Sequence, residues 1–154
     1  MTGRAIASTL ALMLLAAPAA AQQTADKIEV TRSVVDAERK MIVSKNLDLT
    51  EAESEVFWPV YNEYREEIRK VNDKRVLLIR KFAADFATLD DKRAEDLMKD
   101  YLDYQEEHVK TRRTFVKQFS KVLPARKLFR FYQIDGKLNV IVDFELARSI
   151  PLIQ

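Results

Sequence analysis

The fold is decided by residues 49–83, which read LTEAESEVFWPVYNEYREEIRKVNDKRVLLIRKFA. Thr50, followed three residues later by Glu53, is the signature of a capping box, in which each side chain satisfies a backbone amide at the start of a helix. Apolar side chains then recur in steps of three, four and seven, at positions 57, 61, 64, 68, 71, 78 and 82. The pattern therefore predicts one long helix over residues 50–87, in which Pro59 causes a bend rather than an end.

A second long helix is expected after a short turn. Asp90 is suited to cap it, because its carboxylate can accept a hydrogen bond from an amide of the first turn. We expect the helix to run to Lys121. Its inward stripe repeats at a spacing near that of a coiled-coil seam and comprises Leu97, Tyr101, Tyr104, His108, Arg112, Phe115, Phe119 and Val122.

Charge is arranged in alternating blocks along these two helices. Residues 51–67 are mainly acidic, 69–81 mainly basic, 90–107 mainly acidic and 110–130 basic. A short turn makes the two helices antiparallel, so that each acidic block lies beside a basic one. Exposed pairs contribute only about 0.2–1 kcal/mol each, so their main effect is on orientation and register. The pattern predicts a long antiparallel helical hairpin.

A shorter helix is predicted on the N-terminal side of this hairpin, over residues 27–45. Apolar residues at helical spacing mark its expected inward face, which comprises Val30, Val34, Ala37 and Met41. Asn46 is the expected left-handed residue at its end, since Asn tolerates that backbone conformation.

A last helix is predicted from Pro124, which suits a first helical position, to Ala147. Residues 138–146 could also form a strand, but no partner strand is visible, so we favour helix. The fold class is thus all-α: a hairpin with flanking N- and C-terminal helices. Two helices bury a seam rather than a core, so rings such as Phe144 need further partners. We therefore expect a homodimer, with the last helix as its interface.

Residues 1–21 have the features of a secretory signal peptide. Arg4 supplies the positive start, an apolar run follows, and alanines at 19–21 provide the small residues that signal peptidase requires. We expect cleavage after Ala21 and export of a mature chain, residues 22–154, that forms a single helical domain. No membrane insertion is expected after cleavage, because no later segment is apolar over about 20 residues. An uncleaved anchor is the alternative.

Composition argues against several functional classes. The chain has 26 basic residues, of which Arg4 lies in the signal, and 24 acidic residues, and this near-neutral balance is not that of a general nucleic-acid binder. It has no cysteine and only two glycines, so neither a thiol nucleophile nor a glycine-rich phosphate loop is available. No nucleophile lies near a general base in a recognisable arrangement. We expect a protein that is not an enzyme and has no cofactor.

The metal-ligating residue types are sparse. His108 is the only histidine of the chain, and a lone histidine on a helical stripe is typical of core packing. Met41 and Met98 are isolated and suit gap-filling positions. A metal sensor would need several such ligands together, so no metal site is predicted.

The segment Leu49-Thr50-Glu51-Ala52-Glu53 resembles the LTxxQ motif of the Spy/CpxP family of periplasmic stress proteins, with Glu53 in place of Gln. One hairpin later stands Leu123-Pro124-Ala125-Arg126-Lys127, which keeps only the Leu and the helix-starting role. The resemblance implies a cradle-shaped helical dimer in the periplasm. It also implies ATP-independent binding of unfolded client proteins, restraint of a sensor kinase, or metal sensing. In physical terms Leu49, Thr50, Glu53, Leu123 and Pro124 have structural roles.

A basic and aromatic stretch over residues 110–132, from the second long helix into the last one, is the best functional candidate. Its bases are Arg112, Arg113, Lys117, Lys121, Arg126, Lys127 and Arg130, and its rings are Phe115, Phe119, Phe129 and Phe131. The residues assigned to the client-binding surface are Arg112, Arg113, Phe115, Lys117, Phe119 and Lys121. If this surface is open, the bases attract acidic, partly unfolded proteins and the rings hold them. In the alternative, the rings fill the hairpin seam and the acids of the first long helix neutralise the bases. The leading hypothesis is a client-binding chaperone or envelope-stress adaptor; the alternative is a regulatory or metal-responsive subunit that binds a periplasmic sensor domain.

Overall fold

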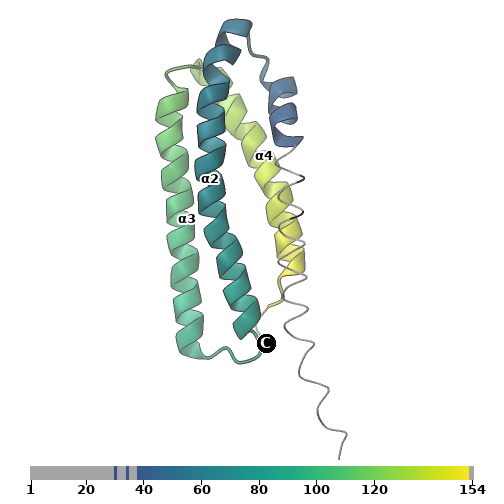
Figure 1. Cartoon of the computed structure of the whole chain (residues 1–154), viewed down its shortest axis with the longest axis vertical. Helices are drawn as coiled ribbons and strands as arrows, with labels where there is room; N and C mark the ends of the chain where they lie inside the picture. Colours follow the sequence, from purple (N-terminus) through teal and green to yellow (C-terminus); the bar gives the residue numbers. More distant parts are fainter. Residues whose placement is uncertain (1–29, 31–33, 35–37, 153–154) are drawn as a thin grey trace, which may run out of the picture.

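The computed structural model describes residues 38–152 and, before them, only Val30 and Val34. The described chain is all-helical and contains no strand, so the predicted all-α class is confirmed. Helix α2 spans Glu51–Asp85, α3 spans Asp91–Phe119 and α4 spans Ala125–Ser149, and a shorter helix covers residues 38–47 (Figure 1). The signal peptide and its cleavage site lie outside the described residues, as does the start of the first helix.

Helix α2 begins at the predicted capping box. The Thr50 hydroxyl accepts a hydrogen bond from the Glu53 amide at 3.2 Å, and the Glu53 carboxylate accepts one from the Thr50 amide at 2.8 Å. Pro59 lies inside the helix and does not end it. The helix stops two residues before the predicted end, at Asp85.

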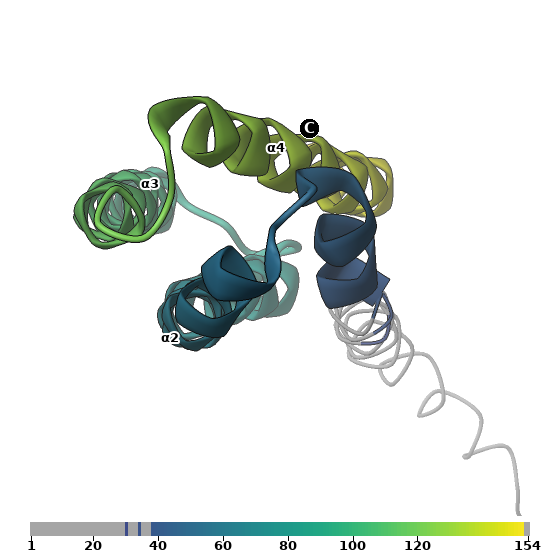
Figure 2. The same ribbon diagram turned by 90° about the horizontal axis from the view of Figure 1, so that it is seen from above.

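Helices α2 and α3 lie side by side and run in opposite directions (Figures 1 and 2). Asp90 caps α3 through its carboxylate, as expected, and accepts from the Arg93 amide at 2.8 Å. Near the α2–α3 turn the basic end of α2 meets the acidic start of α3, in the ion pairs Lys74–Glu107 and Lys81–Asp100. At the opposite end the acidic start of α2 pairs with α4 instead, through Glu53 and Lys127.

Helix α4 includes residues 138–146, so the helical interpretation of that stretch is confirmed. Pro124 is its N-cap rather than its first helical residue, a shift of one position. Figure 2 shows α4 running obliquely past the α2–α3 pair, with the shorter helix beside it on the side away from α3.

The first helix differs from its prediction in two respects. Its expected inward residues Val30, Val34 and Met41 are exposed, whereas Arg39, Val43 and Leu47 are buried. A different side of this helix is buried from the one predicted, because Arg39 pairs with the buried carboxylate of Asp135 on α4. The helix also runs beyond Asn46 to residue 47, and Asp48 adopts the left-handed backbone, with φ 53°.

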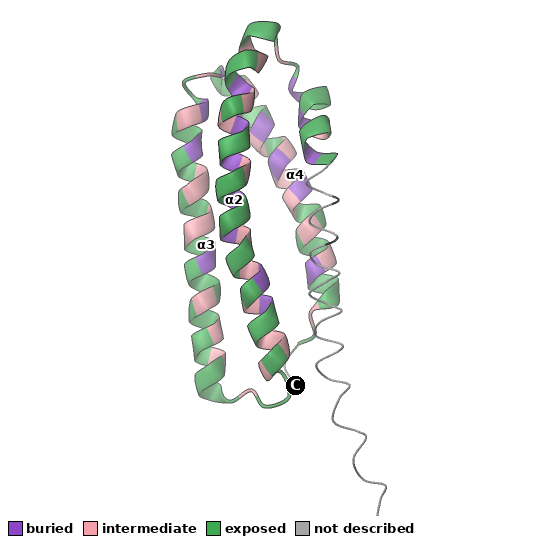
Figure 3. Ribbon diagram, in the orientation of Figure 1, coloured by how far each residue is buried: buried purple, intermediate pink, exposed green. Residues whose placement is uncertain are grey.

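The main core lies near the α3–α4 turn, where buried residues of all four described helices gather (Figure 3). Its members are Val43, Leu47, Phe57, Tyr61, Tyr64, Ile68, Phe115, Phe119, Leu123, Leu128 and Phe131, and we call it the aromatic cluster. A second group, Val76, Ile79 and Leu146, lies nearer the α2–α3 turn. We call this group the distal cluster. Within the described chain, no helix combines the length and apolar character needed to cross a membrane.

Candidate functional site

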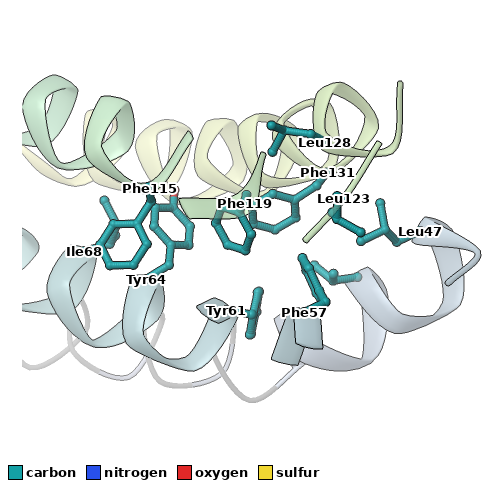
Figure 4. Close-up of a cluster of buried hydrophobic side chains, with 11 residues drawn as sticks. Leu47, Phe57, Tyr61, Tyr64, Ile68, Phe115, Phe119, Leu123, Leu128 and Phe131 are labelled. Carbon is teal, nitrogen blue, oxygen red and sulfur yellow. The ribbon is translucent and has the colours of Figure 1, made fainter. Parts of the chain in front are cut away.

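The two rings of the predicted client-binding surface are not exposed. Phe115 and Phe119 are buried in the aromatic cluster, and this part of the prediction is wrong. Phe119 lies 4.8 Å from Phe131 and 5.5 Å from Phe57, measured between ring centroids. Figure 4 shows these rings pointing toward one another from three helices. The coiled-coil spacing of α3 places them at the helix contact, as the alternative interpretation held.

The four bases of that predicted surface occupy different environments. Arg113, Lys117 and Lys121 are exposed, but Arg112 is half-buried, with its guanidinium carbon 5.2 Å from the centre of the Tyr132 ring. The Tyr132 hydroxyl donates a hydrogen bond to the Arg112 carbonyl at 3.1 Å. Arg112 therefore fastens α3 to α4, and the six predicted residues do not form one continuous surface.

The two motif-like segments meet in space. Leu49 packs against the aromatic cluster, Leu123 is buried within it, and Pro124 caps α4. The Lys127 ammonium donates to the Glu53 carboxylate at 2.5 Å and to the Asp48 carbonyl at 2.8 Å. The hydrogen bond from Lys127 lowers the pKa of Glu53 below its ordinary value, as does the Thr50 amide. The residues that depart from the LTxxQ pattern therefore pair with each other.

A buried polar network joins three of the helices. Asp135 of α4 accepts hydrogen bonds from Arg39 of the first helix at 2.6 Å and from the Tyr64 hydroxyl of α2 at 2.8 Å. Arg39 also donates to the Asn139 side chain at 3.0 Å. Burial and the charge of Asp135 both raise the pKa of Tyr64, which keeps its hydroxyl protonated as a donor. Nothing in the sequence pattern pointed to this network, because its members lie far apart along the chain.

A cavity of about 330 Å³ lies beyond this network, between α2, α3 and α4. Arg39, Arg75, His108 and Asn139 are among its polar lining residues, and Val76, Ile79 and Leu146 are among its apolar ones. Arg75 donates to Asp143 at 2.5 Å, and its guanidinium carbon lies 5.8 Å from the centre of the Tyr104 ring. The cavity thus separates the aromatic cluster from the distal cluster.

His108 faces this cavity from α3 and packs against Tyr104, with ring centroids 5.9 Å apart. Burial lowers its pKa, and the nearby positive charge of Arg112 adds to this effect. Among the residues that the structure describes, no group of three or more histidine, cysteine, aspartate or glutamate side chains is placed to hold a metal ion.

The outward side of α4 carries a surface that the sequence analysis identified only in part, at Arg126, Phe129 and Arg130. Its apolar members are Phe129, Val140, Ile141 and Phe144, which are 66%, 65%, 53% and 59% exposed. Exposed bases share this side, namely Arg126, Arg130, Lys137 and Arg148. We call these eight residues the α4 outer face. The available sequence signal was that residues 138–146 are apolar on more than one side.

The carboxylates of α4 neutralise only one of the four bases of this face, Arg148. Asp135 is buried and Asp143 pairs with Arg75 of α2. Glu145 pairs with Arg148 at the C-terminal end of the helix. A shallow pocket at the other end of the face is lined by Phe129, Arg126, Arg130 and neighbouring residues. The face therefore combines large exposed apolar groups with an excess of positive charge.

Comparison with protein families, with curated proteins and with solved structures gives no match for this chain.

Proposed function

We propose that this protein is an exported, periplasmic, ATP-independent chaperone or envelope-stress adaptor of the Spy/CpxP type, which binds clients and is not an enzyme. The observation that carries the proposal is the α4 outer face, where four large apolar side chains are exposed among four bases. Contiguous exposed apolar groups with a polar rim are typical of protein-binding surfaces. The signal-like residues 1–21 and the two motif-like segments support the same assignment.

The chemistry of the face favours acidic, partly unfolded polypeptides. The bases attract negative charge at a distance and raise the rate of encounter. Phe129, Val140 and Phe144 then offer apolar contacts to any exposed hydrophobic segment. Such contacts form and break without nucleotide hydrolysis. The antiparallel α2–α3 pair supplies rigid support on the other side of α4, and a homodimer would present two such faces as a cradle.

The proposal is tested by aggregation of a chemically denatured acidic client, with and without the mature chain. We expect suppression near stoichiometric amounts, and strong loss of it in the triple variant Phe129→Ser, Val140→Ser, Phe144→Ser. The matched control replaces exposed apolar residues of α2, as Val56→Ser with Leu77→Ser, and should retain activity. All three positions of the test variant are exposed, so circular dichroism should show an unchanged fold.

Charge is tested separately with Arg126→Glu and Lys137→Glu together. This change should slow client capture and remove most of its dependence on salt, because the long-range attraction is lost. Failure of the wild-type chain to suppress aggregation at excess would contradict the proposal, as would full activity of the folded triple-serine variant.

A further inference from the structure

Helix α3 has a second apolar stripe besides the one that it buries. Met98, Leu102, Val109 and Val116 are 59%, 57%, 46% and 41% exposed. They follow one another at steps of four, seven and seven residues and therefore share one side of the helix. At about 100° per residue, this side lies roughly a quarter-turn or more around α3 from Tyr104, Phe115 and Phe119.

From Leu102 on, this stripe repeats once in every heptad. Leu102, Val109 and Val116 occupy the same heptad position in three successive heptads, and two of them are β-branched. An exposed apolar stripe of this kind is typical of a surface that packs against a partner. Among the described residues no helix covers it, since all four of these side chains are substantially exposed.

The charges along α3 indicate which kind of helix could pack against this stripe. Exposed Glu106 and Arg113 flank Val109 on the outer side of the stripe, and neither forms an ion pair with another described residue. The helix is mainly acidic before Val109 and basic after it. If a second α3 packs antiparallel against the stripe, Glu106 of each subunit lies next to Arg113 of the partner subunit. The surface is therefore complementary to a second copy of itself.

We propose that this α3 stripe is the surface at which a second copy of the chain docks, antiparallel, about a two-fold axis near Val109. The assignment differs from the expectation that the last helix forms the dimer interface. The α4 outer face is basic, so two copies of it would repel each other, whereas α3 offers both signs of charge in the order that a two-fold axis requires. The inference concerns α3 alone and does not rest on client binding by α4.

Sedimentation equilibrium of the mature chain over a micromolar concentration series tests the proposal. The wild-type chain should show a reversible monomer–dimer equilibrium. Val109→Glu places two like charges against each other at the axis, and it should raise the dimer dissociation constant by at least about tenfold. Val109 is exposed and Glu is a good helix former, so the variant should fold. The control Val56→Glu makes the same change on α2 and should leave the equilibrium unaltered.

Charge reversal tests the antiparallel pairing. Glu106→Arg and Arg113→Glu should each weaken the dimer, and the double variant should restore it, because the two charges exchange places across the interface. A wild-type chain that stays monomeric throughout the series would overturn the proposal. So would dissociation by Phe144→Glu but not by Val109→Glu, or a double variant weaker than either single one. Aggregation assays on monomeric Val109→Glu then report on client binding independently.

Discussion

The two ends of the molecule are held together in different ways. Near the α3–α4 turn, rings from α2, α3 and α4 pack in tilted and edge-to-face pairs with centroid distances of 4.8 to 6.3 Å and are joined by apolar residues of the first helix. Near the α2–α3 turn, the only described residues that are buried together are Val76, Ile79 and Leu146. Because buried apolar area is the main source of stability, the first end should form the cooperative unit and the second should open more readily.

The two ends also differ in the interactions that join their helices. The aromatic end uses packing reinforced by a buried network around Asp135, whereas the distal end relies on exposed ion pairs such as Lys81–Asp100. Exposed pairs contribute about 0.2–1 kcal/mol each, so they orient α2 and α3 without replacing a core.

The largest effect is expected from Phe131→Ala. Phe131 is fully buried among Phe57, Tyr61 and Phe119, so its removal leaves a cavity that rigid neighbouring rings fill poorly. We expect the free energy of unfolding to fall by about 4 kcal/mol, measured by urea denaturation. A loss below about 1 kcal/mol would show that the aromatic cluster is not the main source of stability.

The second largest effect is expected from Arg39→Met, which should lower the free energy of unfolding by about 3 kcal/mol in the same urea denaturation. The change removes the closer of the two guanidinium groups beside the buried carboxylate of Asp135 and leaves only Arg65, at 3.9 Å, while methionine preserves much of the side-chain volume. Adding Asp135→Asn to Arg39→Met should recover part of the loss, because the poorly compensated charge is then removed. No recovery would mean that packing rather than charge accounts for the effect.

Leu146→Ala should cost about 2 kcal/mol, the low end for such truncations, since the distal cluster is small and borders a cavity into which neighbours can relax. Hydrogen exchange should show the loss of protection confined to the distal parts of α2 and α4. The exposed control Phe144→Ala should have little effect on stability. Protection lost equally in the aromatic cluster would contradict the division into two ends.

The smallest effect is a pH dependence at the cavity between the two ends. His108 lies near Arg112 of α3, Arg75 of α2, and Asp135 and Asp143 of α4, and burial with the two arginines lowers its pKa. The unfolded chain therefore binds this proton more readily, so the free energy of unfolding should decline as pH falls from about 7 through the ordinary histidine pKa to the lower folded value. His108→Gln should flatten the decline. The ring resonances of this single histidine in untagged protein give its pKa directly, and a value at or above the ordinary one would contradict the expectation.

The sequence predicted those features that depend on neighbours along the chain. The Thr50–Glu53 box, the Asp90 cap and the passage of α2 through Pro59 follow from local rules of helix formation. The prediction of the inward face of the first helix was wrong because Arg39 is buried against Asp135, which lies 96 residues away. The periodicity of apolar residues does not detect such a partner. The prediction that Phe115 and Phe119 are exposed was also wrong. An aromatic residue that lies between bases in the sequence can point inward while the bases point outward.

The Glu53–Lys127 contact has a consequence for finding relatives of this chain. Each residue alone is a departure from the LTxxQ motif that its segment resembles, but the two residues are in contact and form one acid–base pair. Selection on such a pair acts on both positions at once, so they should covary: a homologue with glutamine at the first position has no reason to keep lysine at the second. A search that scores the two positions jointly should therefore recognise distant relatives of this chain that two separately scored motifs would miss.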